Sequence, residues 1–295
     1  MDRKKIGGWL SLIAVTVAAA GCSDRQQHTL TIGSKNFTEQ VILGEIVAQH
    51  LERGLHLKVD RKLNLGGTLL AHQALLNKQL DMYPEYSGTA FTNVLKFDPI
   101  SDPNVVLDRV RTAYLATMQL QWLDPLGFNN SFAIAISGAD ARAHHLATLT
   151  DAAAYAPGFA LGAGYEFMQR PDGYGTLNGS YPIHWTASPQ TMDLGLLYTA
   201  LEQKKVSMIA GSTTDAMLAV RDVKVLKDDK NAFPPYQASV VVRSDALAST
   251  PGLKESLSQL SGKIGDDVMR KMNYQVDGLH RSVADVAREF LDNLK

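Results

Sequence analysis

Short apolar strands, glycine-containing turns and helical patterns alternate along this chain, and this alternation limits its fold more than any other feature. The segments 30–33 and 57–63 each have the apolar spacing of a strand, and a helical pattern follows each of them. The turn after the second segment contains Gly66 and Gly67. Repeated strand, turn and helix units predict an α/β sheet, in which ligands bind at the loops that follow the carboxyl ends of the strands.

The alternation stops once and then restarts, which predicts two α/β lobes. An irregular link at 123–130 ends the first set of units, and the apolar run 132–136, typical of a strand buried in a parallel sheet, begins the second. A second link at 233–236 leads to a strand and three helices, and this tail is expected to pack on the first lobe. Two crossings between two lobes would make a hinged cleft. The expected bounds are 30–130 with 236–295 for lobe 1, and 131–235 for lobe 2.

The first 21 residues have the pattern of a signal peptide. Three basic residues at positions 3–5 precede the apolar run 6–20, which is too short to span a bilayer comfortably, and small residues follow it. Cys22 comes directly afterwards and is the only cysteine of the chain. Its place is that of the lipidated cysteine in the lipobox of a bacterial lipoprotein, although Ala19 stands where leucine is usual.

We therefore expect lipid attachment at Cys22, a short polar tether over 22–29, and a periplasmic or cell-surface location on a membrane. The alternative is a secreted protein that is cut near Ala20 and carries an unmodified thiol. Without the signal segment the formal net charge is about −3, and no basic stripe offers a surface for nucleic acid.

Catalysis is not indicated by any familiar arrangement of residues. The sequence contains no Gly-x-Ser-x-Gly elbow and no phosphate-binding loop. Its histidines, such as His50 and His72, are scattered and fit partly buried positions on helices, and no cluster has the spacing of a metal site. We expect no enzyme, no cofactor and no metal.

The stretch 81–89 combines aromatic and hydroxyl groups where the regular pattern breaks, and it predicts a site. Pro84 lacks a backbone donor, so the preceding strand is expected to stop there, and Thr89 can cap a helix over 90–95. This places the ring of Tyr86 beside a helix N-terminus, which favours an anion. The alternative is a polar turn with a tyrosine covering the core.

Lys35 marks a second candidate position. It directly precedes a helix that Asn36 and Glu39 are expected to start as a capping box. The helix dipole disfavours a cation there, so the side chain of Lys35 either extends into water or serves an anion shared with the other loops.

Several blocks of the chain, in order, resemble the signature of the substrate-binding proteins of osmoprotectant uptake ABC transporters, which take up glycine betaine, choline, carnitine and related compounds. The resemblance covers the chain after Cys22. It implies a bilobed periplasmic-binding-protein fold of type II, and it implies ABC permease and ATPase subunits as partners. The blocks are 33–40, 65–68, 81–89, 170–174, 195–201, 214–215 and 272–277.

The resemblance also implies roles for single residues. Tyr86 and Tyr198 match rings that enclose a quaternary ammonium, whereas Lys35, Thr89 and Arg170 match a clamp for a carboxylate. A trimethylammonium has no hydrogen-bond donor, so ring faces recognise it at roughly 0.5 to 2 kcal/mol per desolvated ring. Zwitterionic betaines are then expected to bind more tightly than choline. The full set of candidate ligand-binding residues is Lys35, Tyr86, Thr89, Asn130, Phe132, Arg170, Tyr198 and Ser212.

Two positions depart from the family pattern. Phe132 stands where the family often has tyrosine and keeps a ring, whereas Ser212 stands where the family often has tyrosine and keeps none. Either Trp185, Phe128 or Tyr165 replaces the missing ring, or these three pack elsewhere. The ligand is therefore a glycine betaine-like compound, a bulkier betaine such as ergothioneine, or another amino-acid-like solute, and the loss at Ser212 favours the larger or more polar ligand.

The lipobox pattern around Cys22 predicts that Cys22→Ser releases the protein from membranes without changing its ligand affinity. The reason is that the thioether to lipid forms only at cysteine, and no other thiol is present. Membrane fractionation and ligand titration of the soluble fraction measure the two effects. A variant that stays membrane-bound, or that loses affinity, contradicts lipid attachment at Cys22.

Overall fold

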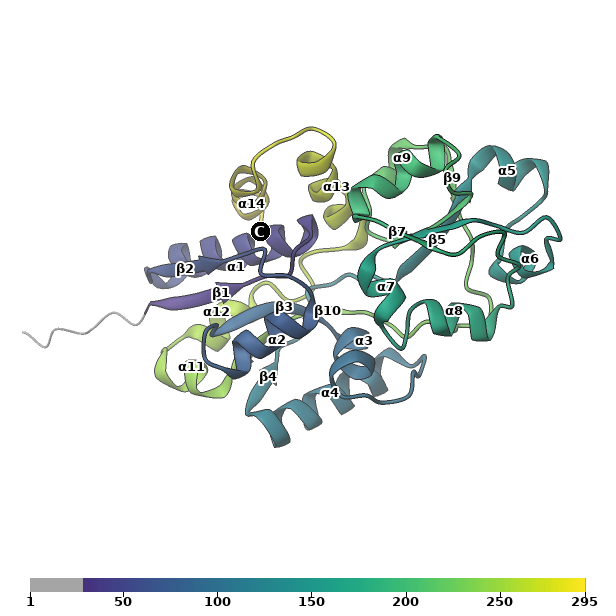
Figure 1. The fold of residues 1–295 in the computed structure, drawn as a ribbon. Coiled ribbons are helices and arrows are strands. Elements are labelled where there is room, and N and C mark those ends of the chain that lie inside the picture. Colours follow the sequence, from purple (N-terminus) through teal and green to yellow (C-terminus); the bar gives the residue numbers. More distant parts are fainter. Residues whose placement is uncertain (1–28, 295) are drawn as a thin grey trace, which may run out of the picture.

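Two five-stranded sheets, each flanked by helices, make up the part of the chain that the computed structural model describes, residues 29–294 (Figure 1). Cys22, the expected signal peptide and most of the expected tether lie outside the described residues. The first sheet has the order β2-β1-β3-β10-β4. Its strands are β1 Leu30–Gly33, β2 Val59–Lys62, β3 Met82–Tyr86, β4 Leu120–Trp122 and β10 Ala238–Arg243.

The helices that precede β4 or follow β10 accompany this first sheet, and we call this part lobe 1. Before β4 they are α1 Thr38–Leu55, α2 Thr68–Leu76, α3 Ser87–Thr89 with a π-helical turn Ala90–Val94, and α4 Pro103–Met118. After β10 they are α11 Ser244–Ser249, α12 Leu253–Ser258, α13 Asp266–Asp277 and α14 Val283–Asp292.

The second sheet, with its helices, forms what we call lobe 2, and its order is β7-β6-β8-β5-β9. Its strands are β5 Phe132–Ser137, β6 Leu161–Ala163, β7 Gln190–Thr191, β8 Met208–Ser212 and β9 Val223–Val225. Its helices are α5 Gly138–Ala143, α6 Leu149–Ala154, α7 Tyr165–Gln169, α8 Tyr174–Ser180, a 3-10 turn Leu194–Leu196, α9 Leu197–Glu202 and α10 Met217–Val220. The architecture confirms the predicted bilobed α/β fold.

Strand β3 does not stop at Pro84, so that expectation was wrong. The strand pairs antiparallel with β10 along its length, with Val240 opposite Pro84 and Ala238 opposite Tyr86. On its other side it pairs with β1 only at Met82. From Pro84 onward the strand therefore has a partner on one side only, which is the situation in which a strand tolerates proline.

Strand β5 is buried as expected, but its direction was predicted wrongly. It pairs antiparallel with both of its neighbours, β8 and β9, instead of lying in a parallel sheet. Helices α5 and α9 pack against it. Its apolar sequence follows from being covered by helices, and this cover does not depend on strand direction.

Two expected helix caps are also absent. Helix α1 begins at Thr38 after Phe37, without a side-chain cap, so Asn36 and Glu39 form no capping box. Thr89 lies inside the helical segment that starts at Ser87 and does not cap it. The side chains of Asn36, Glu39 and Thr89 instead line the cavity between the lobes, so they contribute polar atoms to the candidate site rather than to a helix end.

The C-terminal tail contains four helices instead of the three expected, because α11 follows β10 directly. The tail packs against lobe 1 as predicted, through contacts of α12, α13 and α14 with α1 (Figure 1). Ser282 caps α14 by accepting a hydrogen bond from the backbone of Asp285 at 3.1 Å. His72 lies buried in lobe 1 with its ring 5.5 Å from that of Tyr114, which confirms its expected role in the core.

Two segments carry the chain between the sheets, one after β4 and one before β10. They run antiparallel, with a bridge between Asn129 and Gln237 and a 3.0 Å hydrogen bond from the backbone N–H of Asn130 to the carbonyl of Tyr236. The side chain of Asn129 also accepts from the N–H of Tyr236 at 2.6 Å. The sheets are therefore joined by two adjacent connecting segments, the arrangement that a hinge requires.

The contact between α3 and the second connector, the segment before β10, predicts the effect of Gly88→Ala. An added methyl group would lie 2.6 Å from the carbonyl oxygen of Pro235 and 2.7 Å from the ring of Tyr236. Overpacking of this kind should lower the free energy of unfolding by about 1 to 3 kcal/mol, measured by urea denaturation. Gly175→Ala in α8 is the control, since nothing lies within 4 Å of its added methyl group. Equal effects of the two substitutions would contradict the packing argument.

Candidate ligand-binding cleft

A cavity of about 660 Å³ lies between the lobes, and it is lined by residues of both. The structure brings together all of the residues that the sequence nominated for ligand binding. These are Lys35, Tyr86 and Thr89 from lobe 1, Asn130 from the first connector, and Phe132, Arg170, Tyr198 and Ser212 from lobe 2.

The rings of Tyr86 and Phe132 already contact cations of the chain itself. The Nζ atom of Lys35 lies 4.6 Å from the centroid of the Tyr86 ring. The guanidinium carbon of Arg170 lies 5.2 Å from the centroid of Phe132 and 5.5 Å from that of Tyr236. Two rings of the expected cage, Tyr86 and Phe132, therefore pack on the two cations of the expected clamp through cation–π contacts.

Further aromatic residues line the cavity that sequence reasoning did not nominate, namely Phe37, Phe167 and Tyr236. Of the three residues suggested to replace the missing ring, only Tyr165 lines the cavity, where 57% of it is exposed. Phe128 is buried in the core, and Trp185 is half-buried beside Tyr174, its ring centroid 5.9 Å away. The spacing of aromatic residues along the chain does not show which of them line the cavity and which pack in the core.

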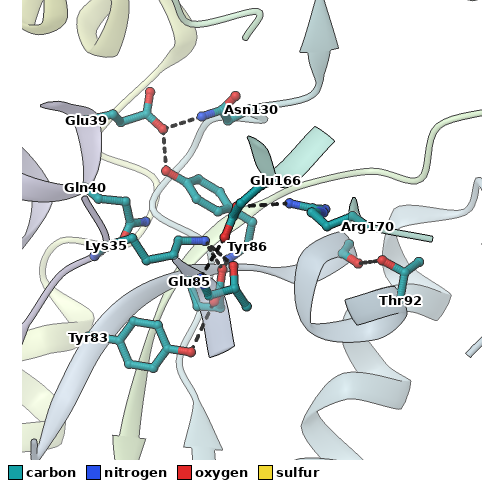
Figure 2. A network of polar contacts seen from close by, with 12 residues as sticks. Lys35, Glu39, Gln40, Tyr83, Glu85, Tyr86, Thr92, Asn130, Glu166 and Arg170 are labelled. Atoms are coloured by element: carbon teal, nitrogen blue, oxygen red, sulfur yellow. Dashed lines mark hydrogen bonds and ion pairs between the residues drawn. The ribbon is translucent and has the colours of Figure 1, made fainter. Parts of the chain in front are cut away.

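Lys35 reaches neither water nor a free anion site, because it is buried against a carboxylate of lobe 1. Its Nζ atom lies 2.7 Å from Oε1 of Glu85, and the two side chains are 1% and 0% exposed. Nζ also donates to the hydroxyl of Thr68 at 3.3 Å. Glu85 accepts two further bonds, from the Tyr83 hydroxyl at 3.1 Å and from the backbone of Tyr86 at 2.7 Å (Figure 2). The ammonium charge is thus neutralised within the protein.

Arg170 is held in the same way by Asp172. Two parallel bonds, Nε to Oδ1 at 2.9 Å and Nη2 to Oδ2 at 2.6 Å, form a buried bidentate pair. The hydroxyls of Thr92 and Tyr236 each donate to Oδ2 of Asp172 at 2.7 Å. Burial alone would raise the pKa of Asp172, but these contacts lower it below its ordinary value. Asp172 does not contact the Nη1 side of the guanidinium. The Nη1 atom lies 3.9 Å from Oε2 of Glu166.

Glu39 is a buried carboxylate of the cleft that sequence reasoning assigned to a helix cap. Its Oε1 atom accepts from the Tyr86 hydroxyl and from the Asn130 amide, both at 2.6 Å (Figure 2). Its Oε2 atom accepts from Thr214 at 2.5 Å and from Asn273 at 3.1 Å. Burial raises the pKa of Glu39, although these four bonds oppose the shift. One side chain thus joins lobe 1, the first connector, lobe 2 and α13.

Ser212 belongs to the same polar network. Its hydroxyl donates to the side-chain oxygen of Asn130 and lies 2.9 Å from the hydroxyl of Thr214. Both of these residues bond to Glu39 in turn. The serine is therefore one link in a chain of hydrogen bonds that crosses from lobe 2 to lobe 1.

The end of the cavity near Tyr198 carries acidic groups that neutral donors surround. Burial, together with the nearby carboxylates of Asp277 and Glu39, raises the pKa of Asp215 to about 6, against hydrogen bonds from the backbone of Met217 and from Tyr198 that lower it. Burial and the neighbouring Asp215 also raise the pKa of the Tyr198 hydroxyl. A cationic ligand would relieve the repulsion among these carboxylates.

Two α/β lobes, two antiparallel connectors and a polar and aromatic cavity between the lobes define a two-lobed solute-binding protein. The chain belongs to the family of substrate-binding domains of ABC-type glycine betaine transport systems, whose model matches residues 28–293. This confirms the family indicated by the sequence blocks. No helix within residues 29–294 is long and apolar enough to cross a membrane.

Named relatives agree with this assignment. The chain is 37% identical over 270 residues to the ergothioneine transport permease/ergothioneine binding protein EgtU of Helicobacter pylori, over 91% of this chain and 48% of that protein, so it spans about half the length of this relative. It is 32% identical to the carnitine transport binding protein OpuCC of Listeria monocytogenes, over 95% of this chain and 92% of that protein.

Solved structures agree as well. The crystal structure of a glycine betaine/carnitine/choline ABC transporter protein superimposes with a TM-score of 0.76 at 33% identity, over 89% of this chain and 97% of that one. This supports the type II periplasmic-binding-protein fold for the present chain.

The raised pKa of Asp215 predicts how stability depends on pH. The folded state retains a proton that the unfolded state loses above about pH 4, so stability falls as the pH rises from about 4 to 6. Asp215→Asn keeps the acceptor for Met217 and removes the charge. It should raise the free energy of unfolding above pH 6 by up to about 3 kcal/mol, and the gain should vanish near pH 4.

Urea denaturation at a series of pH values measures this gain. Asp60→Asn, at an exposed position of β2, is the control and should follow the wild type throughout. A gain for Asp215→Asn that persists at pH 4, or none at pH 7, would contradict the buried-carboxylate argument.

Proposed function

We propose that this chain captures a quaternary-ammonium compound of the glycine betaine type in the cleft and delivers it to the permease of an ABC importer. The observation that supports this most is the cavity itself, which combines aromatic rings with acidic groups held by neutral donors. A methylated ammonium offers no hydrogen-bond donor, so ring faces and carboxylate charge are the groups that recognise it.

In this proposal the rings of Tyr86, Phe132 and Tyr198 surround the methylated ammonium. Asp215, beside Tyr198, supplies negative charge at that end of the cavity. Lys35, Thr89 and Arg170 form the polar end, where a ligand carboxylate would bind. Ser212 bonds to Asn130, and Asn130 bonds to Glu39, so these residues would hold the two lobes together around the ligand.

A bulkier betaine is the alternative ligand, and two observations favour it. The cavity of about 660 Å³ lies in the range of sites for ligands larger than glycine betaine. One relative is named for ergothioneine, which joins a trimethylated ammonium and a carboxylate to an imidazole-derived ring. Ser212 and Tyr165 would then face the additional ring. Another amino-acid-like solute remains the third candidate.

We further propose that Cys22 carries a lipid that holds the protein on the outer side of a membrane, with the lobes divided near residues 130 and 236. Permease and ATPase subunits would be its partners. The name of the EgtU relative joins a permease and a binding protein in one description, which supports a permease as the recipient of the ligand. Binding and delivery need no catalysis by this chain.

A ligand panel tests the proposed function. Glycine betaine, choline, carnitine, proline betaine and ergothioneine are each titrated by calorimetry and by thermal shift. The ligand of the cleft should raise the melting temperature, since binding at 100 times Kd stabilises the folded state by about 2.7 kcal/mol. 3,3-Dimethylbutanoate is the matched control, because it has the shape of glycine betaine without the positive charge, and it should bind far more weakly. If no quaternary ammonium binds, or if the control binds equally well, the proposal is wrong.

A further inference from the structure

Glu166 belongs to α7 of lobe 2, but its carboxylate contacts lobe 1. Its Oε1 atom accepts a 2.8 Å hydrogen bond from the backbone N–H of Thr68, at the start of the nine-residue helix α2. The dipole of that helix favours a carboxylate at this end. A methyl group added to Gly67 would lie 2.5 Å from the same oxygen, so the absence of a side chain at Gly67 leaves room for this position of the carboxylate.

The same carboxylate lies between the two cations of the expected clamp. Figure 2 shows Glu166 between Lys35 and Arg170, and its Oε2 atom is 3.9 Å from Nη1 of Arg170. Thr68, which donates its backbone N–H to Glu166, accepts a bond from Lys35 through its hydroxyl at 3.3 Å. Since Asp172 occupies the Nε and Nη2 side of the guanidinium, the Nη1 side facing Glu166 is the one left for another carboxylate.

The three carboxylates at this end differ in how firmly they are held. Glu85 and Asp172 are 0% exposed and each accept several hydrogen bonds, whereas the Glu166 side chain is 41% exposed and accepts one short bond. Three carboxylates surround two cations there, so the end carries an excess of one negative charge before any ligand arrives. A ligand carboxylate would add a second excess charge unless one of the three moves away.

We infer that Glu166 is an internal substitute for the ligand's carboxylate and sets the charge preference of the cleft. The inference rests on the proposed function and deepens it. While Glu166 holds the backbone of Thr68, the polar end accepts a neutral group and opposes an anion. A betaine carboxylate binds there only by displacing Glu166 from between Lys35 and Arg170, and this displacement reduces its affinity relative to an uncharged counterpart.

Methyl esters test the inference directly. Glycine betaine and ergothioneine are each compared with their own methyl ester, which keeps the quaternary ammonium and loses the negative charge. Glu166→Gln keeps an oxygen that accepts from Thr68 and removes the charge. We expect the affinity ratio of acid to ester to rise about tenfold in Glu166→Gln, because one repulsive charge at the polar end is gone.

Two further variants separate charge from other effects. Glu166→Ala removes both the charge and the bond between the lobes, so the same rise in the ratio should accompany a general loss of affinity. Glu255→Gln, at an exposed position of α12 outside the cavity, removes one charge from lobe 1 and should leave the ratio unchanged.

The outcomes are distinct. If acid or ester binds and the ratio is unchanged or lower in both Glu166 variants, the inference is overturned while the proposed function holds. A rise of the same size in Glu255→Gln also overturns it, because the effect is then general electrostatics. If neither compound nor its ester binds to wild type or to any variant, the proposed function fails, and the inference fails with it.

Discussion

The buried ion pair between Lys35 and Glu85 is the interaction on which the cleft depends. Two charges held at 2.7 Å with almost no exposure survive only because each is paired and hydrogen-bonded, and removal of one partner would leave an uncompensated buried charge. The pair joins the loop before α1 to the end of β3. It thereby fixes the ring of Tyr86, whose backbone donates to the same carboxylate at 2.7 Å. One contact thus connects the sheet, the loop before the first helix and the site.

Neutralisation of both clamp cations has a consequence for ligand binding. In a protein with a bare lysine and arginine, a zwitterion would be favoured by its carboxylate, which was the expectation from the sequence. Here Lys35 and Arg170 hold carboxylates of the chain and also lie over the rings of Tyr86 and Phe132. In the proposed function, the electrostatic attraction for a ligand therefore comes mainly from the acidic end, beside Tyr198, and acts on its cation.

The fold and the residues of the cleft were predictable from the sequence to different degrees. Alternating strands and helices predict two α/β lobes, because the pattern reports burial directly. Glu39 was missed because its spacing from Asn36 fits a capping box equally well, and only the packed structure shows four donors around it. Glu85, Asp172 and Glu166 were missed because a sequence pattern does not show which acidic side chain is paired across the fold. The missing backbone donor of Pro84 also predicted that β3 ends there. The strand continues to Tyr86 because beyond Pro84 it pairs with β10 on one side only.

The structure gives Ser212 a different role from the one that the sequence suggests. Considered alone, it is a position where the family often has a ring, and the loss indicates a larger ligand. In the folded chain its hydroxyl bonds to Asn130, which bonds to Glu39, and Glu39 accepts from Thr214 of the same lobe as Ser212. A ring at 212 would remove the hydroxyl that bonds to Asn130 and lies 2.9 Å from the hydroxyl of Thr214, and these two residues, which both donate to the buried Glu39 carboxyl, would lose a shared partner. The serine is therefore explained by the network between the lobes, and the feature that favours a larger ligand is the cavity of about 660 Å³ rather than the missing ring.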